Sequence, residues 1–323
     1  MTERTTGKPT GAASEEAARG ATPRPAPQKQ KLLEDLVGDL VAEHQVLDEM
    51  VAGVHETSWD LPTPAEGWAV RDQVSHLAFF DEAATLALID PEAFSERAQS
   101  VLSGGSDPMD EHLRRGRAMA PEDLLEWWRK ARRGLTEAAP SSPPGTRVPW
   151  YGPPMALESL ISARVMETWA HGQDVADALG VLRVPTDRLR HVAHIGVRAR
   201  PFSYAVRGLE LPSGSVRVEL DAPSGERWEW EARGVDARAT AGATGDPVDD
   251  ASGKTQDGAT GEIGTVRGTA LDFCLVVTQR RHVDDTGLEV DGALASGWMR
   301  IAQAFAGPPG RGRAAGSARD ARG

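Results

Sequence analysis

One stretch of the chain places several ionisable side chains on a single face of a predicted helix. Residues 163–174 read ARVMETWAHGQD, so Glu167 and His171 lie four residues apart, Arg164 precedes them and Asp174 follows. In an α-helix these spacings form one stripe, which here borders an apolar stripe. Carboxylates and imidazoles are costly to bury unless they are paired or bind a metal. The stretch therefore predicts either a metal site inside a helical bundle or an ordinary intrahelical hydrogen bond.

The composition limits the possible ligands and partners. The chain has 323 residues and one cysteine, Cys274, which excludes an internal disulfide and a zinc site built from several cysteines. No apolar run reaches the roughly 18 residues that cross a bilayer, and no hydrophobic core of a signal peptide is found. The net charge of -12 argues against nucleic acid as a partner. We therefore expect a cytoplasmic protein that binds neither membranes nor nucleic acid.

The texture of the sequence changes along the chain. Residues 1–30 and 307–323 are rich in Ala, Gly, Pro and Arg, and we expect both to be disordered tails. Residues 31–184 have apolar residues at helical spacing and predict an all-α four-helix bundle. Residues 185–306 predict a small α+β domain with a flexible insertion over 236–261.

Local signals give approximate bounds for the expected elements. In the bundle we expect helices over 31–51, 70–89, 107–139 and 155–179, the last of them closed by Gly180. Pro121 is expected to divide the third helix, and Pro91 to end the second. In the C-terminal part we expect helices over 186–199 and from Thr269 and Leu294, a hairpin of strands 216–220 and 227–231, and short strands at 264–267 and 288–290.

Three side chains can converge in such a bundle. His76 lies on the second predicted helix, and Glu167 and His171 lie on the fourth. Two histidines and one carboxylate leave coordination positions open for water or substrate, as in catalytic zinc sites. Zinc is the expected ion for this donor set, although nickel, iron or manganese would also fit. A structural role for His76 in the core is the alternative interpretation.

Three further residues are candidates for supporting roles. Asp174, one turn after His171, is expected either to orient a metal ligand or to face solvent. His44 is on the core-facing stripe of the first helix, either as a core histidine or as a pocket-lining group. Arg164 is a candidate for receiving an anionic substrate. Cys274 is expected to be a buried, inert thiol.

Two motifs together carry a family resemblance. WAVRDQVSHL over residues 68–77 and ETWAHGQD over 167–174 resemble the metal-binding bundle of the DinB-like superfamily. Within it, the motifs are similar to the mycothiol-dependent maleylpyruvate isomerases of actinobacteria, particularly to an uncharacterised metal-binding branch. The resemblance covers roughly residues 31–306. It implies a sterol-carrier-like C-terminal domain and metal ligands at His76, Glu167 and His171.

The resemblance also implies a chemistry. The family uses mycothiol, and a metal ion lowers the pKa of a coordinated thiol. Reversible addition of the thiolate to a small electrophile would isomerise a double bond, whereas addition alone would be a transferase reaction. The family binds substrate through a basic residue of its C-terminal domain, for which Arg280 or Arg281 is the candidate. A metal-containing ligand carrier and a metal-dependent hydrolase remain alternatives.

Overall fold

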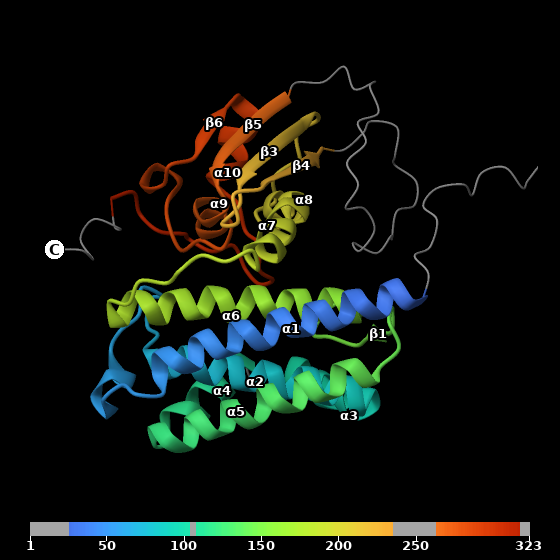
Figure 1. Ribbon diagram of the computed structural model, residues 1–323, viewed down its shortest axis with the longest axis vertical. Coiled ribbons are helices and arrows are strands. Elements are labelled where there is room, and N and C mark those ends of the chain that lie inside the picture. Colours follow the sequence, from blue (N-terminus) through green and yellow to red (C-terminus); the bar gives the residue numbers. More distant parts are fainter. Residues whose placement is uncertain (1–25, 104–107, 235–262, 317–323) are drawn as a thin grey trace, which may run out of the picture.

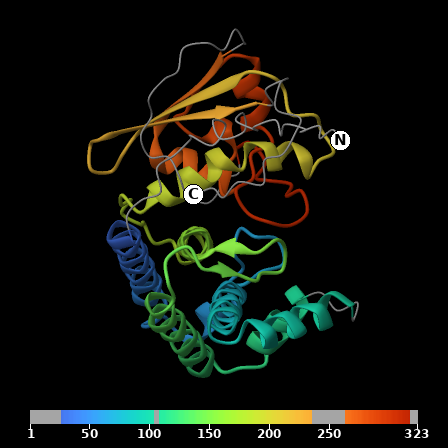
Figure 2. The ribbon, with the colours of Figure 1, turned by 90° about the vertical axis from the view of Figure 1, so that its right-hand side faces the viewer.

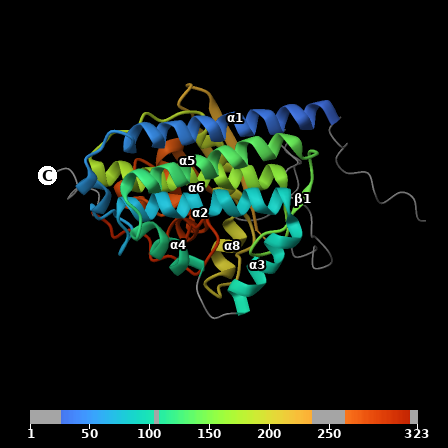
Figure 3. The ribbon, with the colours of Figure 1, turned by 90° about the horizontal axis from the view of Figure 1, so that it is seen from below.

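The computed structural model describes residues 26–103, 108–234 and 263–316. In this part of the chain, four long helices lie side by side and form the lower layer in Figure 1. Figure 3 shows the same helices from below. They are α1 (Ala26–Val51), α2 (Val70–Ile89), α5 (Pro121–Ala138) and α6 (Leu157–Leu179). The shorter elements of this layer are η1 (Glu56–Asp60), α3 (Pro91–Ser103), α4 (Pro108–Arg117), η2 (Ala139–Ser141), β1 (Arg147–Val148) and β2 (Met155–Ala156).

Apolar residues at helical spacing hold this layer together. Leu33 and Leu40 of α1 are fully buried and belong to the same cluster as Ile161 of α6. A second cluster joins Leu77 of α2 to Trp128 of α5. Each fully buried side chain of this size contributes about 1.5–3 kcal/mol relative to an exposed one. The packing therefore fixes the rotation of each helix about its axis, and with it the direction of the polar side chains.

The second and fourth long helices closely follow the expectation, and two other elements differ from it. Helix α1 begins at Ala26 instead of residue 31, so residues 26–30 are not part of a disordered tail. Proline is well tolerated in a first helical turn, and Pro27 occupies that place. Helix α3 is not predicted from the sequence, because Pro91 indicates the end of one helix and is here also the first residue of the next.

Helix α6 ends where the sequence predicts. Gly180 takes the left-handed conformation with φ 66°, and its N–H bonds to the carbonyls of Ala176 and Asp177. Glycine adopts this conformation without the steric penalty that a side chain would introduce. Gly180 thereby ends α6 at Leu179.

The C-terminal part forms a second layer above α6. Its sheet has the order β4-β3-β5-β6, in which β3 and β5 are parallel and the other neighbours are antiparallel. Helices α7 and α9 lie between this sheet and α6 (Figures 1 and 2). The elements are α7 (Leu189–Arg198), α8 (Arg200–Ala205), β3 (Ser215–Asp221), β4 (Arg227–Arg233), β5 (Ile263–Thr269), α9 (Ala270–Val277), η3 (Val283–Asp285), β6 (Glu289–Asp291) and α10 (Ala293–Met299).

The two layers share one helix. Met166 and Trp169 of α6 belong to the same apolar cluster as Phe273 and Trp298 of the C-terminal part. Leu160 and its neighbours on the same helix face the other cluster, toward α1. Helix α6 is thus buried on two sides. The structure confirms a largely helical protein with a small sheet region, as the sequence predicts.

The expectation of a disordered C-terminal tail is wrong for residues 307–316. Arg207 donates from Nη2 to the carbonyl of Gly310 at 3.0 Å, and Gln303 donates from Nε2 to the carbonyl of Pro308 at 3.1 Å. Arg313 forms an ion pair with Asp174 of α6 at 2.9 Å. These bonds hold a segment that has too few apolar side chains to be held by burial alone.

Some expectations concern residues outside the described part of the chain. They are the tail over 1–25, the insertion over 236–261 and the last residues, 317–323. Among the described residues, none of the helices is both long enough and apolar enough to cross a membrane.

Candidate metal centre

The three predicted ligands come together between α2 and α6. One ligand atom from each of His76, Glu167 and His171 lies within 4.8 Å of the other two. The Oε2 atom of Glu167 is 3.1 Å from Nε2 of His171 and 3.6 Å from Nε2 of His76. The intrahelical hydrogen bond between Glu167 and His171 is therefore present, and His76 from the neighbouring helix completes a set that can hold one ion.

The start of α2 positions His76 along the helix axis. The backbone N–H of Ala69 donates to Oδ2 of Asp72 at 2.8 Å, so this carboxylate caps the first turn. Arg117 of α4 binds both oxygens of Asp72, from Nε at 2.8 Å and from Nη2 at 3.0 Å. Because the first turn is tied to α4, His76 is held one turn further along α2.

Burial and hydrogen bonding set the charges in the cluster. Burial, together with the nearby His171, lowers the pKa of His76 to about 3, so its imidazole is neutral at pH 7. Burial alone would raise the pKa of Glu167, but hydrogen bonds with His171 and His76 outweigh it and hold this pKa well below the usual value. A neutral imidazole and an ionised carboxylate are the forms that bind a cation.

The side chain bonded to the outer nitrogen of His171 is Gln73, which the sequence analysis missed. Nδ1 of His171 is hydrogen-bonded to Oε1 of Gln73, and Nε2 of Gln73 donates to Oγ1 of Thr63 at 2.8 Å. Gln73 is fully buried. A glutamine inside a helix usually indicates a surface position. Only the place of Gln73 three residues before His76, on the buried side of α2, could have indicated that it bonds to a metal ligand.

Aromatic rings surround the cluster. The indole of Trp68 stacks on His171, with centroids 5.8 Å apart and an interplanar angle of 18°, and its centroid is 5.4 Å from His76. The ring centroid of Phe80 is 4.6 Å from that of His76. His112 of α4 is fully buried, with its centroid 5.1 Å from His76, and was also missed. As a lone histidine on a short helix, it offered no spacing signal.

Asp174 does not orient a ligand as one interpretation expected. Its carboxylate is buried and binds Nη2 of Arg280 at 2.8 Å and Nη2 of Arg313 at 2.9 Å. It therefore faces neither solvent nor His171. The contact that orients His171 comes from Gln73 on the neighbouring helix, because Asp174 turns toward the C-terminal part.

The arginines considered for substrate binding are engaged in ion pairs. Arg281 binds Asp177 of α6 through both of its terminal nitrogens. Arg280 binds Asp174 and also donates to the carbonyl of Thr278 at 2.7 Å. In this arrangement both guanidinium groups join the C-terminal part to α6.

Arg164 and His44 share a buried carboxylate. Nε of Arg164 lies 2.9 Å from Oδ1 of Asp81, and Nε2 of His44 lies 3.3 Å from Oδ2 of the same residue. All three side chains are at most 3 % exposed. Arg164 is thus paired with Asp81 within the helical layer. His44 is buried in the core of the same layer, against the other oxygen of Asp81.

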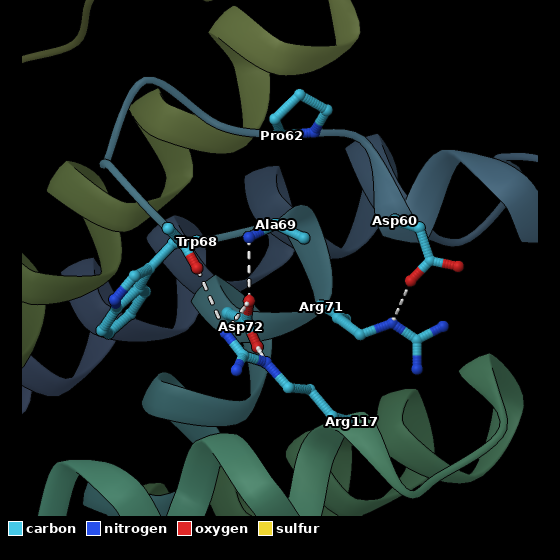
Figure 4. Close-up of a pocket in the computed structure, with 8 residues that line it drawn as sticks. Asp60, Pro62, Trp68, Ala69, Arg71, Asp72 and Arg117 are labelled. Atoms are coloured by element: carbon cyan, nitrogen blue, oxygen red, sulfur yellow. Dashed lines mark hydrogen bonds and ion pairs between the residues drawn. The ribbon is translucent and has the colours of Figure 1, made fainter.

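A surface pocket of about 520 Å³ lies beside the cluster. Figure 4 shows Arg71 directed toward Asp60, and Arg117 directed toward Asp72. The pocket is lined by Asp60, Pro62, Gly67, Trp68, Ala69, Arg71, Asp72 and Arg117. Trp68 belongs both to the wall of this pocket and to the aromatic surroundings of the metal centre, so the loop before α2 joins the two.

Comparisons with known proteins identify the class of the chain. The family model of the mycothiol maleylpyruvate isomerase N-terminal domain matches residues 40–176, a range that contains all three residues of the cluster. The uncharacterised proteins Rv0036c and MT0041, from two strains of Mycobacterium tuberculosis, are each 40% identical over 277 residues. The match covers 86% of this chain and 97% of each relative.

The chain belongs to one family with these uncharacterised mycobacterial proteins, and its residues 40–176 match the N-terminal domain of the mycothiol maleylpyruvate isomerases. Among solved structures, crystal structures of the mycothiol-dependent maleylpyruvate isomerase and of its histidine-to-alanine mutant are similar at 16% identity. Each match covers 80% of this chain and 92% of the other, with TM-scores of 0.48 and 0.49.

Proposed function

We propose that the protein binds one divalent metal ion through His76, Glu167 and His171 and carries out small-thiol chemistry at it. The reaction would be a mycothiol-dependent isomerisation of a small electrophile, or the transfer of the thiol to one. The observation that carries the proposal is the convergence of these three side chains from α2 and α6. The isomerase family model covers the same residues.

The residues fit a divalent ion by their donor chemistry. The set offers two imidazole nitrogens and one carboxylate, which suits zinc and leaves coordination positions open. His76 is neutral and Glu167 is ionised near pH 7, so binding an ion requires no costly deprotonation of either. A bound ion would lower the pKa of a coordinated thiol, so that the nucleophilic thiolate would be present at neutral pH.

The thiol would come from outside the chain. The one cysteine, Cys274, is fully buried in the C-terminal cluster, and burial raises the pKa of its thiol well above the usual value. Its Sγ donates to the carbonyl of Leu189 at 3.4 Å. Such a thiol is inert. Trp68, Phe80 and His112 would limit the access of water to the reacting groups.

The proposal extends to the wider organisation. We propose a DinB-like four-helix bundle that begins with α1 and ends at residue 184, and a sterol-carrier-like domain from residue 185 onward, with the reaction site on the bundle side of α6. A cytoplasmic location in an actinobacterium is part of the proposal, because mycothiol is the implied partner and the relatives are mycobacterial.

The test begins with metal content. Purified protein should hold about one ion per chain, and His171→Ala should lose it. His55→Ala removes an exposed histidine of the loop after α1 and should keep the ion. Metal absent from the wild type, or retained by His171→Ala, would remove the proposal.

Calorimetric titration with mycothiol and with glutathione then tests the thiol. Mycothiol should bind the metal-loaded protein and not His76→Ala. Equal binding by the metal-free protein contradicts the proposal. A tightly retained apolar ligand without thiol turnover would favour a carrier, and thiol-independent hydrolysis would favour a hydrolase.

A further inference from the structure

A chain of hydrogen bonds leads from the metal centre to the loop before α2. Nδ1 of His171 bonds to Oε1 of Gln73, and Nε2 of Gln73 donates to Oγ1 of Thr63 at 2.8 Å. Oγ1 of Thr63 donates in turn to the carbonyl of Trp68 at 2.9 Å. Gln73 is fully buried and Thr63 is 8% exposed, so water competes little for these groups.

The donor and the acceptor of each of these hydrogen bonds follow from the last bond, to the carbonyl of Trp68. A carbonyl can only accept, so the single hydroxyl proton of Thr63 is donated to Trp68. The hydroxyl oxygen must then accept from Gln73, which turns the amide NH₂ toward Thr63 and the amide oxygen toward His171. Because that oxygen also only accepts, His171 carries a proton on Nδ1. Nε2 is the nitrogen that faces Glu167, and it is the atom that a bound ion would take as its ligand.

The same loop is also fixed by its backbone and by its ring. The N–H of Thr63 donates to the carbonyl of Trp68 at 2.7 Å, and Pro62 and Ala69 form an isolated β-bridge. The indole of Trp68 stacks on His171. The loop is therefore connected to His171 in two ways, directly by the ring of Trp68 and indirectly by the hydrogen bonds of Thr63 with Gln73 of α2 and of Gln73 with His171.

We propose that Gln73 and Thr63 are positioning residues of the metal centre, which hold His171 in the Nδ1–H tautomer and tie its orientation to the loop over residues 61–69. This inference rests on the proposed metal function. The loop also supplies Pro62, Gly67 and Trp68 to the surface pocket. Movement of the loop away from α2 would break the bond from Gln73 to Thr63 and loosen His171.

The experiment measures metal affinity and not turnover. Zn²⁺ affinity is determined by competition with a chromophoric chelator, and the Co²⁺ absorption spectrum reports the ligand geometry. Gln73→Leu should lower the affinity about 10- to 100-fold, as loss of a partner of a ligating histidine does. Gln73→Glu keeps an acceptor for Nδ1–H and should stay within about threefold of the wild type.

Variants of Thr63 and a remote control complete the series. Thr63→Val removes the hydroxyl that orients Gln73 and should also weaken binding, whereas Thr63→Ser should retain it. Gln45→Leu changes an exposed glutamine of α1 and should bind as the wild type does. If Gln73→Leu does not fold, the comparisons of Gln73→Glu with the wild type and of Thr63→Val with Thr63→Ser decide the question.

The outcomes separate this inference from the proposed function. If the wild type binds no stoichiometric metal, the proposed function fails first. If the wild type binds metal and a folded Gln73→Leu binds it within about twofold, the positioning role is refuted. Loss of affinity in Gln73→Glu equal to that in Gln73→Leu, or equal affinities of Thr63→Val and Thr63→Ser, would refute it as well.

Discussion

Arg281, in the turn after α9, binds both carboxylate oxygens of Asp177 on α6, from Nη1 at 2.7 Å and from Nη2 at 2.9 Å. Asp174, on the same helix, binds Arg280 and Arg313. Three guanidinium groups from the C-terminal part thus meet two carboxylates just beyond His171. The interface between the two layers is therefore polar at the end of α6 that lies next to the metal centre.

Arg281→Ala should lower the free energy of unfolding by about 1.5–3 kcal/mol, because it removes two charge-assisted hydrogen bonds and leaves a half-buried carboxylate without them. Denaturant unfolding measures the change. Arg227→Ala removes an exposed arginine paired with an exposed Asp221 and should change stability by less than about 0.5 kcal/mol. Equal effects of the two substitutions would contradict the interface role of Arg281.

The ligand set was accessible to prediction because it depends on local spacing. Glu167 and His171 are four residues apart on one helix, and His76 occupies the buried side of another helix that ends before Pro91. Periodicity determines which face of a helix is buried, and the buried faces must meet. The bounds of α2 follow from the same pattern, as do those of α6 apart from its first two residues.

The ion-pair partners of the other charged residues could not be predicted from local spacing. Arg164 meets Asp81 from 83 positions away, and Asp174 meets Arg313 from 139 positions away. No local pattern encodes such pairs, because they depend on how whole layers dock. The tail that carries Arg313 has a composition that resembles disorder, and its order comes from hydrogen bonds and this ion pair.

Asp81→Asn should destabilise the helical layer strongly. The substitution leaves the buried guanidinium of Arg164 without a counter-charge, and loss of one partner of a buried pair costs about 3–5 kcal/mol. Urea unfolding measures the loss. Asp35→Asn, in an exposed pair with Lys31, is the control and should be nearly neutral. A loss below about 1 kcal/mol for Asp81→Asn would show that Arg164 does not depend on this carboxylate.

Acid should destabilise the protein in part through Asp48. The hydrogen bond from Arg129 lowers the pKa of Asp48, burial opposes this, and the nearby charge of Arg132 adds to the lowering. Since the folded-state pKa lies below the unfolded one, the stabilisation is complete above about pH 5 and is lost as pH falls through the folded pKa. The difference in melting temperature between the wild type and Asp48→Asn, measured with a chelator present, should therefore become smaller as the pH falls from 7 to 3. A constant gap would contradict the assignment.

The contact of α7 with α9 has no room for an added methyl group. A Cβ atom at Gly196 would lie 2.6 Å from Cγ2 of Val277, which is fully buried and, being β-branched, has little freedom to rotate in a helix. Gly196→Ala should therefore cost about 1–3 kcal/mol by overpacking, despite the better helix propensity of alanine. Gly38→Ala is the matched change, because Gly38 is an exposed position inside α1 with no atom within 4 Å of the added Cβ, and it should stabilise by up to about 1 kcal/mol. Thermal unfolding of Gly196→Ala and Gly38→Ala, at unchanged metal content, measures the two effects. If both substitutions stabilise the protein, α7 and α9 can separate to admit the methyl group.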